Sequence, residues 1–274
     1  DGKTFDFSWA KGWTIGGEGT DVKKYKKWND IMHSCGCSAI YSGYGCSELF
    51  SATCVEKIDA RYNCSKSIMS VGIPYAGITM GVFTESGEEL SYGQRGELWI
   101  KSKSAMKEYY NKPELTAQTK IDGWIHTGDL AEIDENGFVY IWGRCKDTIA
   151  LSNGREIYLF DVANKLKEKE FIDDAIVLLL PLRGPKKQLA AHIVWTDTPS
   201  EAEKIQRITE LNKMLKDYLP SELAVFGYAV HEGMLPYSPI SLKKDKNKMS
   251  KQTIGYVQVI DGHLRTVSID ITDK

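Results

Sequence analysis

The spacing of apolar residues changes along the chain and predicts where helices and strands lie. Near the start, apolar residues recur at intervals of three or four, at Val22, Tyr25, Trp28 and Met32. With lysines on the opposite face, this spacing predicts an amphipathic helix over Asp21–Ser34. The apolar run Cys37–Tyr41 then predicts a short buried strand, which we expect to end in a loop at Ser42–Gly45.

From Val71 to Trp142 the pattern is that of short β segments. It is strongest at Thr79–Phe83, Glu97–Ile100, Leu130–Ile133 and Phe138–Ile141. The last two segments predict a hairpin, because the Asp134–Gly137 sequence between them ends in Asn-Gly, a pair that accepts the positive φ angles of a tight turn.

After Arg144, helical and strand patterns alternate. They predict a helix, two strands, a second helix and a strand, at Leu159–Lys169, Ala175–Leu180, Leu189–Trp195, Ser200–Leu219 and Val225–Val230. Ser200 and Glu203 form a capping-box pattern, and Pro220 ends the second helix. That helix directs inward Ile205, Ile208, Leu211, Leu215 and Leu219. Two helices with three strands are typical of a compact α+β domain. A tail hairpin is predicted at Tyr256–Ile260 and His263–Ile269.

Composition places the chain among soluble globular proteins. Of its 274 residues, 42% are hydrophobic and 26% are charged, and the formal net charge is −2. A net charge this small does not indicate electrostatic attraction to a nucleic acid or to a membrane surface. We find no apolar run near the roughly 18 residues that a membrane helix needs. The start lacks Met and a signal-peptide core, so we expect a cytoplasmic protein whose chain begins inside a longer one.

The six cysteines raise the question of a metal site. They are Cys35, Cys37, Cys46, Cys54, Cys64 and Cys145. Their spacing lacks the paired Cys-x-x-Cys knuckles that surround a tetrahedral zinc ion, so we favour reduced thiols over zinc.

Two early motifs combine groups that suit a nucleotide. The first is Gly16-Gly17-Glu18, in which paired glycines permit close approach of backbone to a flat ligand, although alone they indicate only a turn. The second is Tyr44-Gly45-Cys46-Ser47-Glu48, after the buried strand. Its ring can stack on a purine, its hydroxyl can donate to phosphate and its carboxylate can bind Mg²⁺, but it can also be a turn with a helix cap.

Two later motifs add a carboxylate and a guanidinium. In Trp124–Leu130, Asp129 stands where it can accept hydrogen bonds from ribose hydroxyls, or it is simply a turn residue. In Gly143–Ile149, Arg144 suits a ribose or phosphate oxygen, and the change of composition there is equally typical of a hinge or a linker salt bridge.

Taken in order, these motifs resemble the adenylate-forming superfamily of acyl-CoA synthetases, peptide-synthetase adenylation domains and luciferase. Gly96–Ile100, Tyr109–Asn111 and Pro113 resemble that family's core segment between the second and third motifs. The likeness covers nearly all of residues 14–250. Enzymes of this family join a carboxylate to ATP, releasing pyrophosphate, and then rotate a small domain so that a thiol, often that of coenzyme A, attacks the acyl-adenylate.

The resemblance implies a fold of mixed α+β and α/β character in more than one domain. Residues 1–142 would be the C-terminal part of the large AMP-binding domain, a strand-helix piece followed by a β-rich subdomain. Residues 143–148 would be a hinge, and 149–274 a small mobile α+β domain.

It also implies roles for single residues. The adenine would be bordered by Gly16, Gly17, Glu18, Tyr44 and Gly45, with the Tyr44 ring stacked on it. Ser47 would touch the α-phosphate and Glu48 would hold Mg²⁺, while Asp129 and Arg144 would bind the ribose hydroxyls.

Further along, Lys146 falls on the hinge position, and Gly154, in Ser152-Asn153-Gly154, would line the pantetheine channel. The family's adenylation lysine ends a Leu-Pro-x-Thr-x-x-Gly-Lys run. Here the run is Leu235–Lys243, without its Gly and with the lysine one residue late. We favour Lys243, with Lys244 or a non-catalytic site as the alternatives. The usual Pro and Glu after the pantetheine loop are replaced by Leu159 and Asp161.

The family's Ser/Thr/Gly-rich loop that holds the β- and γ-phosphates has no counterpart in the sequence. We therefore expect a fragment whose N-terminal half, with that loop, is missing and which is inactive alone. The predicted function of the whole protein is a carboxylate–CoA ligase using ATP, Mg²⁺, coenzyme A and a small-molecule carboxylic acid that the sequence does not identify. The alternatives are an adenylation domain that loads a carrier protein and a non-catalytic binding module.

Overall fold

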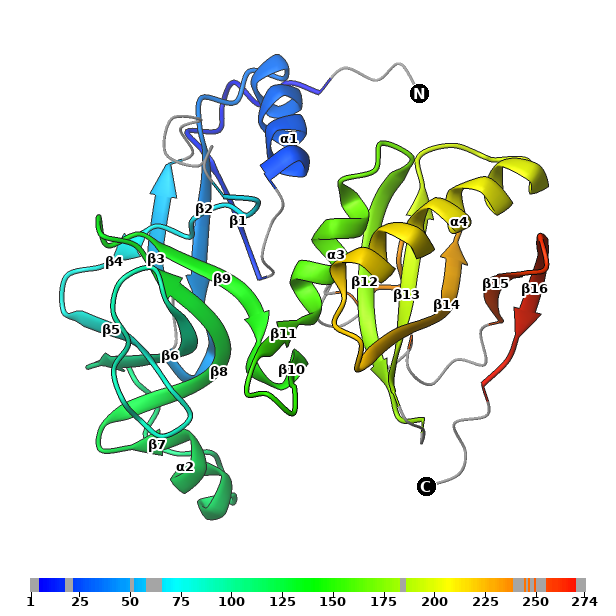
Figure 1. The fold of residues 1–274 in the computed structure, drawn as a ribbon. Coiled ribbons are helices and arrows are strands. Elements are labelled where there is room, and N and C mark those ends of the chain that lie inside the picture. Colours follow the sequence, from blue (N-terminus) through cyan, green and yellow to red (C-terminus); the bar gives the residue numbers. More distant parts are fainter. Residues whose placement is uncertain are drawn as a thin grey trace. The chain divides into compact units, whose positions relative to one another are not determined.

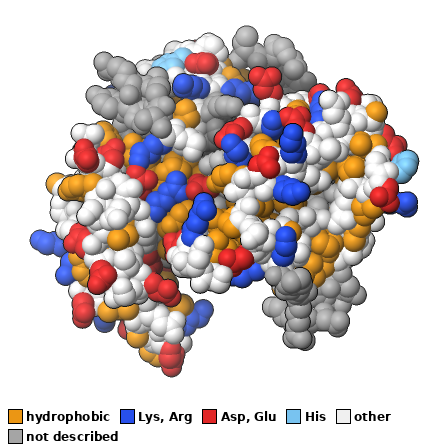
Figure 2. Space-filling view, in the orientation of Figure 1, with side chains coloured by type: hydrophobic (Ala, Val, Ile, Leu, Met, Phe, Trp, Pro, Cys, Tyr) orange, Lys and Arg blue, Asp and Glu red, His pale blue; other side chains and the backbone are white. Residues whose placement is uncertain are grey.

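The computed structural model describes residues 5–17, 22–49, 52–57, 66–182, 186–238, 244, 246, 249 and 255–269. The chain divides into two compact units, Asp1–Lys146 and Asp147–Lys274, which we describe separately. Figure 2 shows basic and acidic side chains interspersed over the face drawn, in keeping with the formal net charge of −2.

Unit 1 begins with a small mixed sheet. Its strands lie in the order β1-β2-β3-β4, at Trp13–Gly16, Ile40–Gly45, Ala52–Lys57 and Ile73–Pro74. β1 and β2 are parallel and the other pairs are antiparallel. Helix α1 (Val22–Ser34) connects β1 to β2, and its buried Tyr25 packs with Ile40 and Met69 (Figure 1). The parallel pair brings the carboxyl ends of β1 and β2 to one edge of the sheet.

A second, antiparallel sheet completes unit 1. Its strands are β5 (Ile78–Phe83), β6 (Arg95–Ser102), β8 (Trp124–Ile133) and β7 (Lys120–Ile121), in that order, with β9 (Val139–Arg144) also paired to β8. The short elements of unit 1 are η1 (Ser47–Leu49) and α2 (Pro113–Thr119), and η2 (Cys145–Asp147) spans the boundary between the two units. Leu49 joins the fully buried core of this sheet, so η1 is anchored directly beneath the strands.

Unit 2 is a five-stranded sheet with two helices on one face. The order is β12-β13-β14-β15-β16, at Ile172–Leu180, Lys187–Trp195, Leu223–His231, Tyr256–Ile260 and His263–Val267. The helices are α3 (Leu159–Lys167) and α4 (Glu201–Tyr218), preceded by the small hairpin β10 (Thr148–Ala150) and β11 (Glu156–Tyr158). Figure 1 shows α3 and α4 against the sheet of unit 2. Apolar side chains of both helices and of β12, β13 and β14 form one core.

The mixed α+β class and the order of elements agree with the sequence prediction. The capping box of Ser200 with Glu203 is present at the start of α4, where Ile208, Leu211 and Leu215 are buried. The tail hairpin is present as β15 and β16 and extends the sheet of unit 2.

Three local predictions are wrong. The expected loop Ser42–Gly45 is part of β2, because neighbouring strands pair with Ser42 and Gly43 on both sides and satisfy their backbone groups. The hairpin connection after Ile133 is longer than a tight turn. In it Asp134 accepts from the amides of Asn136 and Phe138, at 3.0 and 2.9 Å, and Gly137 alone has positive φ. Trp28, one of the apolar residues that predicted the buried face of α1, is 50% exposed, whereas Tyr25 on the same helix is buried.

Unit 2 holds a buried imidazole that should make its stability depend on pH. His192 is 0% exposed, and its Nδ1 lies 2.9 Å from Nε2 of His231. Burial, and next the neighbouring His231, lower the pKa of His192 to about 4.

Because this pKa is depressed, the folded state favours the neutral ring. The neutral His192 ring contributes fully to the free energy of unfolding above the unfolded pKa of about 6.5. This contribution is lost as the pH falls from there to about 4. We expect protonation to cost about 3 kcal/mol of unfolding free energy, measured by urea denaturation at pH 7.5 and 4.5. A His192→Leu variant should lose correspondingly less between the two pH values. An equal loss in both proteins would contradict this assignment.

Candidate functional site

The carboxylate of Asp129 joins the two sheets of unit 1 at the candidate site. Its Oδ2 accepts a hydrogen bond from the hydroxyl of Tyr44, on β2, at 2.7 Å. Its Oδ1 accepts from Nη1 of Arg144, on β9, also at 2.7 Å. Asp129 and Arg144 are register partners across β8 and β9, which explains why residues so far apart in sequence meet.

Both partners are held in the forms that donate hydrogen bonds. Burial, and next the charge of Asp129, raise the pKa of the Tyr44 phenol, so its hydroxyl keeps its proton. Burial acts to lower the pKa of Arg144, but the Asp129 carboxylate outweighs burial and raises it. The site therefore presents one anion between two donors, and a ligand with hydroxyl groups could replace either donor.

A bulge in β8 aims Asp129 toward these partners. Opposite the Glu97–Trp99 stretch of β6, β8 carries extra residues at Thr127–Asp129, and Gly128 has a φ of 65° there. A Cβ on Gly128 would lie 3.1 Å from Nη2 of Arg144, so this position combines a left-handed backbone with a crowded neighbour.

Side chains from the same strands hold the bulge in place. Oε1 of Glu97 accepts from the amide of Gly128 at 2.8 Å, and Oγ1 of Thr127 donates to the carbonyl of Leu98 at 2.7 Å. Oγ1 of Thr127 also accepts from the amide of Asp129 at 3.1 Å. Sequence reasoning assigned no role to Glu97 or Thr127. The available signal was an acidic residue within the strand pattern Glu97–Ile100.

A second carboxylate, that of Glu48, lies in η1 close to this cluster. Its Oε1 accepts from the hydroxyl of Tyr109 at 2.5 Å, and its backbone carbonyl accepts from the amide of Met106 at 2.6 Å. Burial disfavours the charged form, but the hydrogen bonds, that of Tyr109 foremost, outweigh it and lower the pKa of Glu48. Glu48 is therefore a carboxylate at neutral pH, fixed at both side chain and backbone. Sequence reasoning gave Tyr109 no role in the site.

Cys46 lies near enough to both carboxylates to be affected by their charge, and it stays a neutral thiol. Burial, and next the charge of Glu48, raise its pKa to about 12, and Asp129 adds to the rise. A thiol in that form is a poor nucleophile and a poor metal ligand. Among the described residues, no group of three or more His, Cys, Asp or Glu side chains is arranged to hold a metal ion.

The first glycines lie beside the strand that carries Tyr44. Gly16 pairs with Gly43, and a Cβ on Gly16 would lie 2.8 Å from the Gly43 carbonyl oxygen, so strand pairing itself requires glycine there. Gly17, directly after β1, has a φ of 100°, a conformation that favours glycine. Gly45 is the last residue of β2, and Ser47 is exposed at the start of η1.

Four predicted site residues are not part of this cluster. Glu18 and Lys243 lie outside the described residues. Gly154, with a φ of 80°, turns the β10–β11 connection in unit 2. Lys146 is exposed and is the last residue of unit 1.

The alternative lysine, Lys244, has a different environment. Its Nζ donates to Oδ1 of the buried Asp174 at 2.8 Å, which ties the segment that contains it to β12.

Comparisons with known proteins agree with this arrangement of residues. Residues 3–110 match the family model of AMP-binding enzymes. A fatty acid–[acyl-carrier-protein] ligase, ScoC of Streptomyces coeruleorubidus, is 37% identical over 114 residues, which is 42% of this chain and 22% of that protein. A long-chain-fatty-acid–CoA ligase of Bacillus subtilis is 32% identical over 178 residues, 65% of this chain and 30% of that protein. Over residues 3–110 the chain is therefore similar to AMP-binding enzymes.

A solved structure shows a similar fold. The O-succinylbenzoate coenzyme A synthetase MenE of Bacillus subtilis, in complex with AMP, matches with a TM-score of 0.69 and 22% identity over 92% of this chain and 48% of MenE. The chain thus spans less than half the length of these members of the adenylate-forming superfamily. Within the described residues, no helix is both long and apolar enough to cross a membrane.

Proposed function

We propose that the full-length protein is an AMP-forming carboxylate–CoA ligase that works through an acyl-adenylate. The observation that carries the proposal is the Asp129 carboxylate, with Tyr44 on one oxygen and Arg144 on the other, beside the ionised Glu48. A non-catalytic relative would have no reason to keep this set of donors and acceptors in place. The B. subtilis relative, named for long-chain fatty acids and CoA, supports the same class of reaction.

In this proposal the cluster of unit 1 binds the nucleoside. Asp129 accepts hydrogen bonds from the ribose hydroxyls, and Arg144 donates to a ribose oxygen. Tyr44 presents its ring to the adenine, bordered by Gly16, Gly17, Glu18 and Gly45. Ser47, exposed at the start of η1, donates to the α-phosphate.

The residues present fit a magnesium ion. Mg²⁺ is commonly bound by one or two carboxylates together with phosphates of the substrate. Glu48 supplies one carboxylate that is charged at neutral pH and positioned by Tyr109. When bound, the ion would neutralise charge on the phosphates. The role of this chain is to hold the Glu48 carboxylate in a fixed place.

The same proposal gives unit 2 a part in both steps of the reaction. The carboxylate of the acid attacks the α-phosphorus and pyrophosphate leaves; the CoA thiol then attacks the acyl carbon and AMP leaves. We propose that Lys146 is the hinge between the two steps and that Gly154 borders the pantetheine. Lys243 would offset charge at the α-phosphate in the first step. The contact of Lys244 with Asp174 favours a structural role for Lys244.

A carrier-protein thiol is the alternative acceptor. The ligase ScoC, with 37% identity, is named for an acyl-carrier protein rather than for CoA, which favours this second candidate. The two candidates share the adenylation step and differ only in the thiol.

The test is to assay the full-length protein with ATP and a panel of carboxylic acids. We expect acid-dependent ATP–pyrophosphate exchange, and thioester only when CoA is added. Thioester formed only on a carrier protein would replace the first candidate by the second, and absence of both exchange and AMP binding would favour the non-catalytic module. The 274-residue chain alone should show no exchange, because it contains no phosphate-binding loop.

A Tyr109→Phe variant of the full-length enzyme tests the role of Glu48. Loss of the hydroxyl removes a hydrogen bond that lowers the Glu48 pKa, so the acid limb of the pH–rate profile should move to higher pH. The Mg²⁺ concentration for half-maximal rate should rise about tenfold. Tyr110→Phe is the matched control, since Tyr110 is 88% exposed. Equal profiles for the two variants would exclude Tyr109 as a positioning residue.

A further inference from the structure

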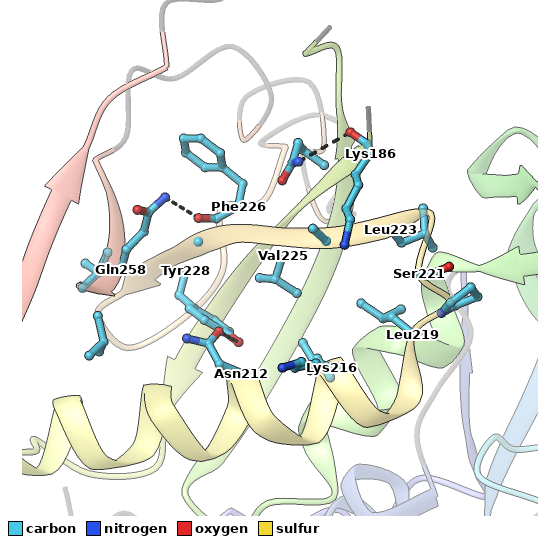
Figure 3. A pocket seen from close by; sticks show the side chains of 17 residues that line it. Lys186, Asn212, Lys216, Leu219, Ser221, Leu223, Val225, Phe226, Tyr228 and Gln258 are labelled. Atoms are coloured by element: carbon cyan, nitrogen blue, oxygen red, sulfur yellow. Dashed lines mark hydrogen bonds between the residues drawn. The ribbon is translucent and has the colours of Figure 1, made fainter. Parts of the chain in front are cut away.

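Unit 2 contains a hollow that the proposed reaction does not use. It has a volume of about 660 Å³ and lies between α4, β14 and β15 (Figure 3). All of its lining residues belong to unit 2, between Lys186 and Val259. Figure 3 shows Val225 and Tyr228 directed from β14 toward α4, which contains Asn212 and is followed by Leu219.

The hollow exists because β14 and β15 diverge. In the described residues their ladder is limited to Tyr228 with Val257, whereas β15 and β16 pair along their whole length. A register shift against β13 leaves Phe226 as an extra residue in β14. Beyond the shift, Nε2 of Gln258 donates to the Phe226 carbonyl at 2.5 Å, so a side chain replaces the backbone donor that a continuous ladder would provide. This keeps the two strands apart without leaving that carbonyl unsatisfied.

The wall of the hollow is apolar and still meets solvent. Leu219, Val225, Val257 and Val259 are only partly buried, although each packs against the main core of unit 2. A ligand with an apolar chain would remove their remaining surface from water, and this removal is the main favourable contribution to binding in such hollows.

The charged groups of the lining have one sign. Lys186 and Lys216 line the hollow and are exposed, and no Asp or Glu is among the described residues that line it. Tyr228 is held inside by its hydroxyl, which donates to Oδ1 of Asn212 at 3.0 Å and keeps its proton because burial raises its pKa. A ligand that matches this lining would have an apolar chain for the apolar wall and an anionic end for the two lysines.

We propose that the hollow binds a single-chain amphiphile ending in a carboxylate, with its chain against the valines and Leu219 and its carboxylate at Lys186 and Lys216. The site is separate from the nucleotide cluster, because every lining residue lies in unit 2. It therefore does not depend on the proposed ligase activity.

The test uses the 274-residue chain and decanoate in titration calorimetry. We expect one-to-one binding that Lys216→Glu and Lys186→Glu each weaken by roughly three- to tenfold, through loss of a partly exposed ion pair and gain of a repulsive charge. Lys213→Glu, on the same helix but outside the lining, is the matched control and should not change the affinity. Decan-1-ol should bind several-fold more weakly than decanoate.

Three outcomes would overturn the proposal. The first is no decanoate binding up to millimolar concentration. The second is decanoate binding that neither lysine variant weakens, or an affinity for decan-1-ol equal to that for decanoate. The third is concentration-dependent dimerisation in sedimentation that buries the hollow and that decanoate does not compete with, since the occupant would then be a second copy of the chain.

Discussion

Replacing Lys243 by alanine in the full-length enzyme is expected to lower the rate of acyl-adenylate formation by roughly 10²- to 10³-fold. The reason is that a positive charge aimed at the α-phosphate stabilises charge that develops in the transition state, within a site from which water is excluded. The measurement is acid-dependent ATP–pyrophosphate exchange. Conversion of preformed acyl-adenylate to thioester should be much less affected, because the small domain that contains Lys243 is proposed to rotate between the two steps.

Lys244→Ala is expected to act on stability instead. Lys244 and Asp174 form an ion pair whose side chains are 19% and 8% exposed, so removing the cation leaves a carboxylate in a poorly solvated place. We expect the variant to lose about 2–3 kcal/mol of unfolding free energy, measured by urea denaturation. The exchange rate per folded molecule should stay near that of the parent.

Lys251→Ala is the control for the net change of charge, because Lys251 ends the basic run Lys243, Lys244, Lys246, Lys248 and Lys251. If Lys243→Ala exchanges pyrophosphate at the parental rate while Lys244→Ala does not, the roles of the two lysines are the reverse of those proposed. If neither variant is impaired, the motif is not catalytic.

The second large effect is expected at Asp129. Asp129→Ala in the full-length enzyme should weaken AMP binding by about 10- to 100-fold, because two charge-assisted hydrogen bonds to the ribose are lost together. The measurement is calorimetric titration with AMP, supported by the loss of AMP-dependent thermal stabilisation.

Asp129→Asn separates shape from charge. The amide keeps one acceptor oxygen but replaces the other by an NH2 donor and removes the charge, so we expect an affinity between that of the parent and that of Asp129→Ala. Glu135→Ala, in the exposed connection between β8 and β9, controls for loss of a carboxylate on the same hairpin. Unchanged AMP affinity in Asp129→Ala would remove Asp129 from the nucleotide site.

Much of the fold follows from local chemistry and was predictable. Helix α4 is an example: the Ser200–Glu203 capping box starts it, Pro220 follows its end and Ile208, Leu211 and Leu215 are buried. These features act over a few residues, so a sequence pattern contains them. The pattern failed where a distant neighbour decided the outcome. Gly43 reads as a loop residue, yet pairing with Gly16 and Val55 makes it part of a strand.

The candidate site shows the same division. The residue types of Tyr44, Glu48, Asp129 and Arg144, in that order, point to a nucleotide. Their positioning residues did not emerge from the sequence. Tyr109 reaches Glu48 across 61 positions, and Glu97 reaches the amide of Gly128 across 31. Such contacts depend on which strands are neighbours and on a bulge in β8, neither of which has a local sequence period.

The sequence by itself determined which side-chain types are available for the candidate site, the capping and periodicity of the helices, and the resemblance to adenylate-forming enzymes. Only the tertiary structure decided that Asp129 lies between Tyr44 and Arg144, that Lys244 pairs with the buried Asp174, and that β14 and β15 diverge to leave a hollow. The physical reason is one of range. Propensity, capping and turn chemistry act between close neighbours in the chain, whereas a carboxylate's partners and a gap between strands depend on how distant segments pack.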